Sequence, residues 1–203
     1  DVKPDSVYWC AADVGWVTGH SYIVYGPLNN GATGVLYEGD PMFPTPARHW
    51  EIIERYNVTQ YYTAPTLIRA FIKAGAEHPA SHDLTSLRLC ASGGAPVPAE
   101  IARRWEAVTG HPLVEGYGLT ETTAPTHSNP PHRPRYGTVG VPLPYTGIRL
   151  VSLEDGVTEV EPGQSGEIAV RGPMVTKGYW GKPAETADAG PDGWLRTGDI
   201  GRV

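Results

Sequence analysis

The segment 115–123, Glu-Gly-Tyr-Gly-Leu-Thr-Glu-Thr-Thr, brings together three side chains that suit a nucleotide and its metal. Tyr117 offers an aromatic face, Thr120 a hydroxyl that can donate to a phosphate oxygen, and Glu121 a hard carboxylate oxygen of the kind that Mg²⁺ prefers. The segment follows the apolar end of a predicted strand. An ordinary polar loop is the alternative, and composition alone favours it.

Two further segments could complete a nucleotide site. The run Ser-Gly-Gly-Ala-Pro at 92–96 follows a predicted strand, where ligands of open parallel sheets bind and where glycines let the backbone approach a flat ligand. The run Trp-Leu-Arg-Thr-Gly-Asp at 194–199 ends in Asp199, whose carboxylate could accept hydrogen bonds from two neighbouring hydroxyls, as on a ribose. Taken alone, each is also compatible with a simple surface turn.

The first 120 residues alternate short apolar runs with amphipathic segments. Pro46, Pro65 and Pro98 are good first-turn residues for helices, two of which we expect to end at Gly75 and Gly110. Strands are expected at 7–10, 34–37, 59–63, 87–92 and 113–117. This alternation predicts an α/β fold, a mostly parallel sheet with helices on its faces.

From about residue 129 the helical periodicity disappears. Short strands are expected at 147–152 and 166–171, separated by a turn-rich stretch, which indicates a small antiparallel sheet or barrel. We therefore expect residues 1–128 to form the α/β portion of a large domain and residues 129–203 a β-rich portion of the same domain.

Composition excludes several functional classes. A net charge of −6, without any basic run, argues against a nucleic-acid surface. No apolar stretch approaches the ~20 residues that span a bilayer. Cys10 and Cys90 lie far apart without metal-type spacing, which favours a reducing compartment and hence a cytoplasmic location.

Taken in order, the segments resemble the acyl-adenylate-forming (AMP-binding) superfamily, which includes acyl-coenzyme A synthetases. Residues 117–121 match one family motif, Gly-Glu-Ile through Gly-Tyr-Trp at 166–180 the next, and 194–199 a third. The resemblance implies a ligase that uses ATP, Mg²⁺ and coenzyme A: a carboxylate forms acyl-AMP and pyrophosphate, and coenzyme A then displaces AMP. A small-molecule acid would be the partner, and the oligomeric state is not predicted.

The resemblance also implies roles for individual residues. Thr120 would meet the α-phosphate and Glu121 would bind Mg²⁺, so that both act in catalysis, while Asp199 would hold the ribose hydroxyls. Six residues would border the adenine: Gly94, Ala95, Pro96, Glu115, Gly116 and Tyr117.

The first part of the chain has a closer likeness, to acetyl- and propionyl-coenzyme A synthetases, at 13–22 and 62–66. In that family the segment Trp16, Val17 and Thr18 lines the acyl pocket, although Trp16 could instead be a core aromatic. The second part resembles fatty-acyl and aryl-acid ligases, either as a natural branch or as a joined sequence. Gly118 stands where the acetate enzymes carry a pocket-closing Trp, so we expect an acid longer than acetate.

Three other functions remain open: an acetyl- or propionyl-coenzyme A synthetase, an adenylation domain that loads a carrier protein, and a non-catalytic nucleotide-binding remnant. No segment matches the family's glycine-rich phosphate loop or the catalytic Lys of its C-terminal lid. We therefore expect the chain to be part of a longer enzyme and to be inactive in isolation.

Overall fold

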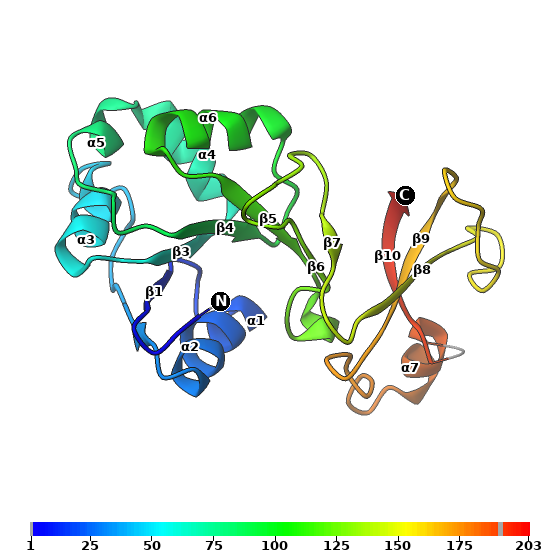
Figure 1. Ribbon diagram of the computed structural model, residues 1–203. Coiled ribbons are helices and arrows are strands. Elements are labelled where there is room, and N and C mark those ends of the chain that lie inside the picture. The colour runs from blue at the N-terminus through cyan, green and yellow to red at the C-terminus, as the bar shows by residue number, and fades with distance from the viewer. Residues whose placement is uncertain (1, 191–192) are drawn as a thin grey trace. The chain divides into compact units, whose positions relative to one another are not determined.

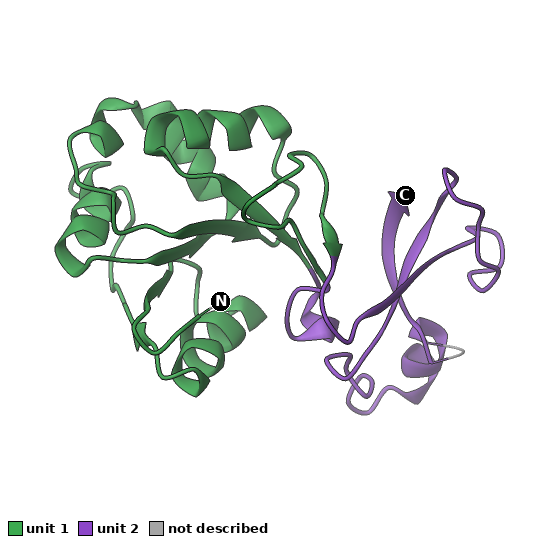
Figure 2. Ribbon diagram, in the orientation of Figure 1, with its two compact units in different colours: residues 1–117, 127–141 green, residues 118–126, 142–203 purple. Residues whose placement is uncertain are grey.

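The computed structural model describes residues 2–190 and 193–203. They form two compact units, one of residues 1–117 and 127–141 and the other of residues 118–126 and 142–203, coloured separately in Figure 2. The boundary expected between residues 128 and 129 remains a prediction about domains. The two compact units do not divide at a single point in the sequence, because residues 118–126 belong to the second unit and residues 127–141 to the first.

Unit 1 is built on a sheet with the strand order β2-β1-β3-β4-β5-β6-β7. The first five of these strands run parallel, and β6 pairs with β5 in the antiparallel sense. The strand bounds are β1 Val7–Cys10, β2 Thr33–Gly34, β3 Gln60–Thr63, β4 Leu89–Gly93, β5 Leu113–Tyr117, β6 His127–Ser128 and β7 Val141–Pro142. The expected strand at 34–37 is thus wrong beyond Gly34. Register pairs Thr33 and Gly34 with β1, and the Val35 N–H adds a 2.9 Å hydrogen bond to the Tyr8 carbonyl.

Helices lie on both faces of this sheet, as Figure 1 shows for α4 and α6 on one side and α1 and α2 on the other. Their bounds are α1 Val17–Gly19, the π-helical stretch η1 His20–Tyr25, α2 Gly26–Asn29, α3 Arg48–Tyr56, α4 Pro65–Ala74, α5 Glu77–Ala80 and α6 Ala99–Thr109. The predicted stops are confirmed for α4 and α6, whose C-cap residues are Gly75 and Gly110. Gly110 adopts a left-handed backbone with φ 74°, which glycine reaches without a Cβ penalty.

Aromatic rings fill the core between α3, α4, α6 and the sheet. Trp50 of α3 packs on Trp105 of α6 with ring centroids 5.6 Å apart, and Tyr61 of β3 stacks on Trp105 at 6.2 Å. On the same side His49 stacks on Trp9 at 4.5 Å. Each of these side chains is almost wholly buried, so this cluster fixes the strands whose carboxyl ends carry the candidate site.

Unit 2 contains a three-stranded antiparallel sheet in the order β10-β9-β8, as expected for the β-rich part. The bounds are β8 Gly147–Val151, β9 Ser165–Arg171 and β10 Leu195–Arg202, with a single-turn 3₁₀ helix η2 at Thr120–Thr122 and α7 at Pro183–Ala189. Among the described residues, no helix is both long and apolar enough to cross a bilayer.

Candidate functional site

The turn that follows β4 is shaped by glycine. Gly94 adopts φ +87°, and an added Cβ there would meet nothing within 4 Å, so its backbone angle, not crowding, favours glycine. Gly94, Ala95 and Pro96 are all exposed at this turn. A flat ligand could therefore reach the backbone without displacing a side chain.

The end of β5 lies directly beside that turn. Register pairs Ser92 with Glu115 and Gly93 with Gly116, and a Glu115 carboxylate oxygen accepts a 3.3 Å hydrogen bond from the Val97 N–H. Partial burial raises the pKa of Glu115, against a smaller lowering by this hydrogen bond. Unit 1 thus brings together the two segments that were expected to border an adenine.

Tyr117 ends β5 with its ring half-buried. Its centroid lies 5.7 Å from that of His127, at an interplanar angle of 57°. Gly93, which pairs with Gly116 beside Tyr117, has no room for a side chain. A Cβ there would collide with the Tyr62 phenol oxygen and lie 2.8 Å from the Gly116 carbonyl oxygen. Tyr62 in turn stacks on Tyr22 with centroids 4.8 Å apart. The motifs did not indicate this tyrosine pair, whose members lie forty residues apart in the sequence.

In unit 2 the residues Thr120 and Glu121 sit on the 3₁₀ turn η2. The buried Thr122 hydroxyl accepts from the Leu119 N–H at 2.9 Å and donates to the Ala124 carbonyl at 2.8 Å, which fixes the turn from inside. Thr120 is exposed and Glu121 half-buried. The hydroxyl and the carboxylate thus follow one another on a turn held by its own hydrogen bonds.

The segment 174–179 forms hydrogen bonds with η2. The Tyr179 phenol donates a 3.0 Å hydrogen bond to a carboxylate oxygen of Glu121, and the Thr176 N–H donates to the Glu121 carbonyl at 2.7 Å. A carboxylate has about four lone-pair positions, so a bond to one phenol leaves capacity for a cation. Because Mg²⁺ is commonly held by one or two carboxylates plus phosphates and waters, Glu121 fits the expected ligand role.

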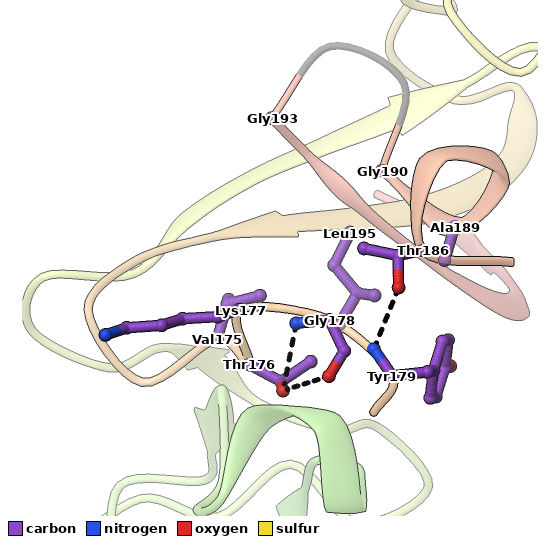
Figure 3. Close-up of a pocket in the computed structure, with 10 residues that line it drawn as sticks. All are labelled: Val175, Thr176, Lys177, Gly178, Tyr179, Thr186, Ala189, Gly190, Gly193 and Leu195. Carbon is purple, nitrogen blue, oxygen red and sulfur yellow. Dashed lines mark hydrogen bonds between the residues drawn. The ribbon is translucent and has the colours of Figure 1, made fainter. Parts of the chain in front are cut away.

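A cavity of about 190 Å³ lies beside this segment (Figure 3). Two hydrogen bonds connect residues that line the cavity. The Thr186 hydroxyl accepts from the Tyr179 N–H at 2.9 Å, and the Thr176 hydroxyl accepts from the Gly178 N–H at 3.3 Å. These bonds fix the backbone on which the Tyr179 side chain stands.

Asp199 lies on β10 and is exposed. Its N–H donates to the Thr197 hydroxyl oxygen at 3.2 Å, and the preceding Gly198 has φ +78°. Glu167 of β9 accepts from the Gly198 N–H at 2.9 Å and from the Arg196 guanidinium at 3.0 Å. Glu167 lay within a matched motif, but the motif did not indicate this contact.

The proposed acyl-pocket residues differ in their surroundings. Trp16 is 70% exposed, so it is not a core aromatic, while Val17 and Thr18 begin α1 and are half-buried. At Gly118, an added Cβ would lie 2.6 Å from the Ala124 carbonyl oxygen and 2.8 Å from the Pro125 Cα. Backbone therefore occupies the volume that a side chain at this position would need.

The AMP-binding enzyme family matches residues 1–180. The chain belongs to this family. It is 46% identical over its whole length to acetyl-coenzyme A synthetase of Mycolicibacterium smegmatis, and 42% identical over 90% of its length to that of Pyrobaculum aerophilum. It spans only 23% and 28% of these two relatives.

Solved structures of adenylate-forming ligases share the fold of this AMP-binding chain. The anthranilate CoA ligase AuaEII in complex with anthranoyl-AMP superposes with a TM-score of 0.89 at 28% identity, covering all of this chain and 38% of that one. The ATP-bound RpMatB-BxBclM chimera B3 gives 0.86 at 31% identity, covering all of this chain and 39% of the chimera. The predicted α/β fold with a small antiparallel sheet and the predicted superfamily are both confirmed.

Proposed function

We propose that the protein to which this chain belongs is an AMP-forming acid–coenzyme A ligase. A carboxylate oxygen of the acid attacks the α-phosphorus of ATP, the bond to pyrophosphate breaks, and acyl-AMP forms. The coenzyme A sulfur then attacks the acyl carbon, and AMP leaves with the bonding electron pair. The chain's residues serve alignment and charge neutralisation, which supply most of the catalysis in transfers at phosphorus.

The observation that carries this proposal is the hydrogen-bonded turn that bears Thr120 and Glu121. Thr122 fixes the turn from within, and Tyr179 orients the Glu121 carboxylate from a segment far along the chain. In the proposed function Thr120 donates to the α-phosphate and Glu121 holds Mg²⁺, which would neutralise phosphate charge. Asp199 accepts from the ribose, and the turns at 94–96 and 115–117 border the adenine.

The nature of the acid is the finer part of the proposal. A missing indole at position 118 favours an acid longer than acetate, but the backbone of Ala124 and Pro125 fills the space that the Gly118 Cβ would enter. The relatives named above are acetyl-coenzyme A synthetases. We therefore propose a short acid with acetate as the first candidate, bounded by Trp16, Val17 and Thr18.

The test uses the full-length protein with Mg²⁺, ATP, coenzyme A and unbranched acids of two to ten carbons. We expect acid-dependent exchange of pyrophosphate into ATP without coenzyme A, and AMP with a thioester once coenzyme A is added. Absence of acid-dependent exchange would contradict the ligase. An optimum at six or more carbons would leave the ligase intact and restore the longer acid.

A further inference from the structure

Strand β10 carries a bulge at the segment that ends in Asp199. Arg196 pairs with Ala169 of β9 and Ile200 with Glu167, so residues 197–199 stand opposite the single residue Ile168. The left-handed backbone of Gly198 turns the chain out of the ladder at this point. A bulge of this kind can change the direction in which side chains leave the strand, and Asp199 is the last residue of this one.

Glu167 holds both sides of the bulge. One carboxylate oxygen accepts from the Gly198 N–H at 2.9 Å, and the other accepts from Nε of Arg196 at 3.0 Å. This second oxygen also lies 3.0 Å from Nη2 of Arg196, in an ion pair. The residue is 8% exposed, so this carboxylate is largely withdrawn from water. Hydrogen bonds to an ionised acceptor are roughly twice as strong as neutral ones, and the Arg196 guanidinium compensates the buried charge.

We propose that Glu167 is a positioning residue for nucleotide binding: by fixing the bulge it aims the Asp199 carboxylate at the two ribose hydroxyls. This inference rests on the proposed function, which assigns Asp199 to the ribose. Asp199 itself is tied to the bulge through its N–H and the Thr197 hydroxyl, and Thr197 donates to the Ile168 carbonyl at 2.8 Å. These bonds connect Asp199, Thr197 and Gly198 to two neighbouring residues of β9, Ile168 and Glu167.

Glutamate is specific for this task. In Glu167→Gln the amide oxygen could still accept from Gly198, but the NH₂ group would face the Arg196 guanidinium, donor against donor. We expect the bulge to lose its fixed position while the strand pairing on either side remains. The loss should concern the ribose hydroxyls and spare the rest of the nucleotide.

The experiment compares ATP with 2′-deoxy-ATP in the full-length protein, as kcat/KM in pyrophosphate exchange and as Kd for non-hydrolysable analogues of both nucleotides. We expect the wild type to prefer ATP and Glu167→Gln to reduce that preference on the order of tenfold, mainly through KM for ATP. Arg196→Lys keeps the positive charge but lacks the two guanidinium nitrogens that face Glu167. It should reduce the preference for ATP by a smaller factor than Glu167→Gln. The matched control is Glu185→Gln, an exposed carboxylate 3.6 Å from Lys182 in the same unit.

Two background measurements separate the possible failures. If the wild type does not prefer ATP, or if Asp199→Ala keeps the preference, the ribose assignment of Asp199 is lost and this inference falls with it. If Asp199→Ala removes the preference but Glu167→Gln and Arg196→Lys keep it, only the positioning role is overturned. An equal loss for both nucleotides in these two variants would also overturn it, since a purely structural role acts on both alike. In the Asp199→Ala background, Glu167→Gln should cause no further loss of preference.

Discussion

The Tyr179 phenol donates a 3.0 Å hydrogen bond to a Glu121 carboxylate oxygen across 58 residues of sequence. This bond raises the pKa of Tyr179, because ionising the phenol would place a second negative charge beside Glu121. The phenol therefore stays a donor to this carboxylate through the neutral range.

Removing the phenol oxygen should change the metal dependence of the ligase. In Tyr179→Phe the Glu121 carboxylate loses a neutral donor worth about 0.5–1.5 kcal/mol, so the Mg²⁺ concentration for half-maximal pyrophosphate exchange should rise severalfold. The rate at saturating Mg²⁺ should stay close to that of the wild type. Tyr145→Phe, at a position 87% exposed, is the control. An unaltered Mg²⁺ titration in Tyr179→Phe would deny that this bond supports metal binding.

Glu121→Gln keeps the shape of the side chain and removes its charge. Because Mg²⁺ prefers charged oxygen ligands, pyrophosphate exchange should fall steeply at ordinary Mg²⁺ and recover in part when Mg²⁺ is raised. Glu154→Gln, an exposed loop carboxylate of the same unit, serves as control. A rate equal to that of the wild type would make Glu121 an ordinary loop residue.

Asp199→Ala removes the proposed ribose acceptor. Loss of hydrogen bonds to a charged group should weaken kcat/KM for ATP by roughly 1.5–3 kcal/mol. Asp188→Ala, an exposed carboxylate on α7, should leave this value unchanged. Normal use of ATP by the Asp199 variant would remove the residue from the nucleotide site.

Gly118→Ala tests whether space is open at this position. Its Cβ would lie 2.6 Å from the Ala124 carbonyl oxygen, so the backbone must shift, at a cost of about 1–3 kcal/mol in the free energy of unfolding. Rates with all acids should fall together, without a change in their order. Gly34→Ala is the control, since a Cβ there would meet nothing within 4 Å. Equal stability of the two variants, with a shift toward shorter acids, would show that the pocket extends to residue 118.

Buried His49 should make the stability of the fold sensitive to acid. Burial lowers the pKa of His49 to about 4, against a smaller raising effect of its hydrogen bond with the Pro41 carbonyl. An unfolded histidine has a pKa of about 6.5, so between these values the unfolded chain binds a proton that the folded chain does not. Stability should be fully present above about pH 6.5 and should fall as the pH drops toward 4, by about 3 kcal/mol in total.

His49→Phe isolates this contribution, because it keeps a ring against Trp9 and Phe71 and does not titrate. Denaturant unfolding at pH 7.0 and pH 4.5, followed by the fluorescence of the buried tryptophans, should show a smaller difference in the variant than in the wild type. His132→Phe, at an exposed position, should retain the wild-type difference. The same pH dependence in wild type and His49→Phe would mean that His49 takes up its proton without a penalty in the folded state.

Local signals in the sequence were sufficient for most of the fold. Strands 7–10 and 113–117 and the start of α4 at Pro65 coincide with the expected bounds, because alternation, first-turn prolines and terminal glycines act over a few residues. The same signals missed β10, whose Gly198 breaks the strand pattern at the bulge. They also missed the helical stretch 17–29, in which a π-helical segment lacks the usual 3.6-residue period.

The sequence by itself determined which residue types stand at the candidate site, through the order of its motifs, and that order correctly indicated the AMP-binding family. Only the tertiary structure decided how those residues are held. Tyr179 meets Glu121, and Glu167 meets Gly198 at a separation of 31 residues. It also decided that backbone fills the space at Gly118. Such contacts depend on strand register and bulges, which are set by the packing of segments far apart in the chain and leave no periodic trace in the sequence.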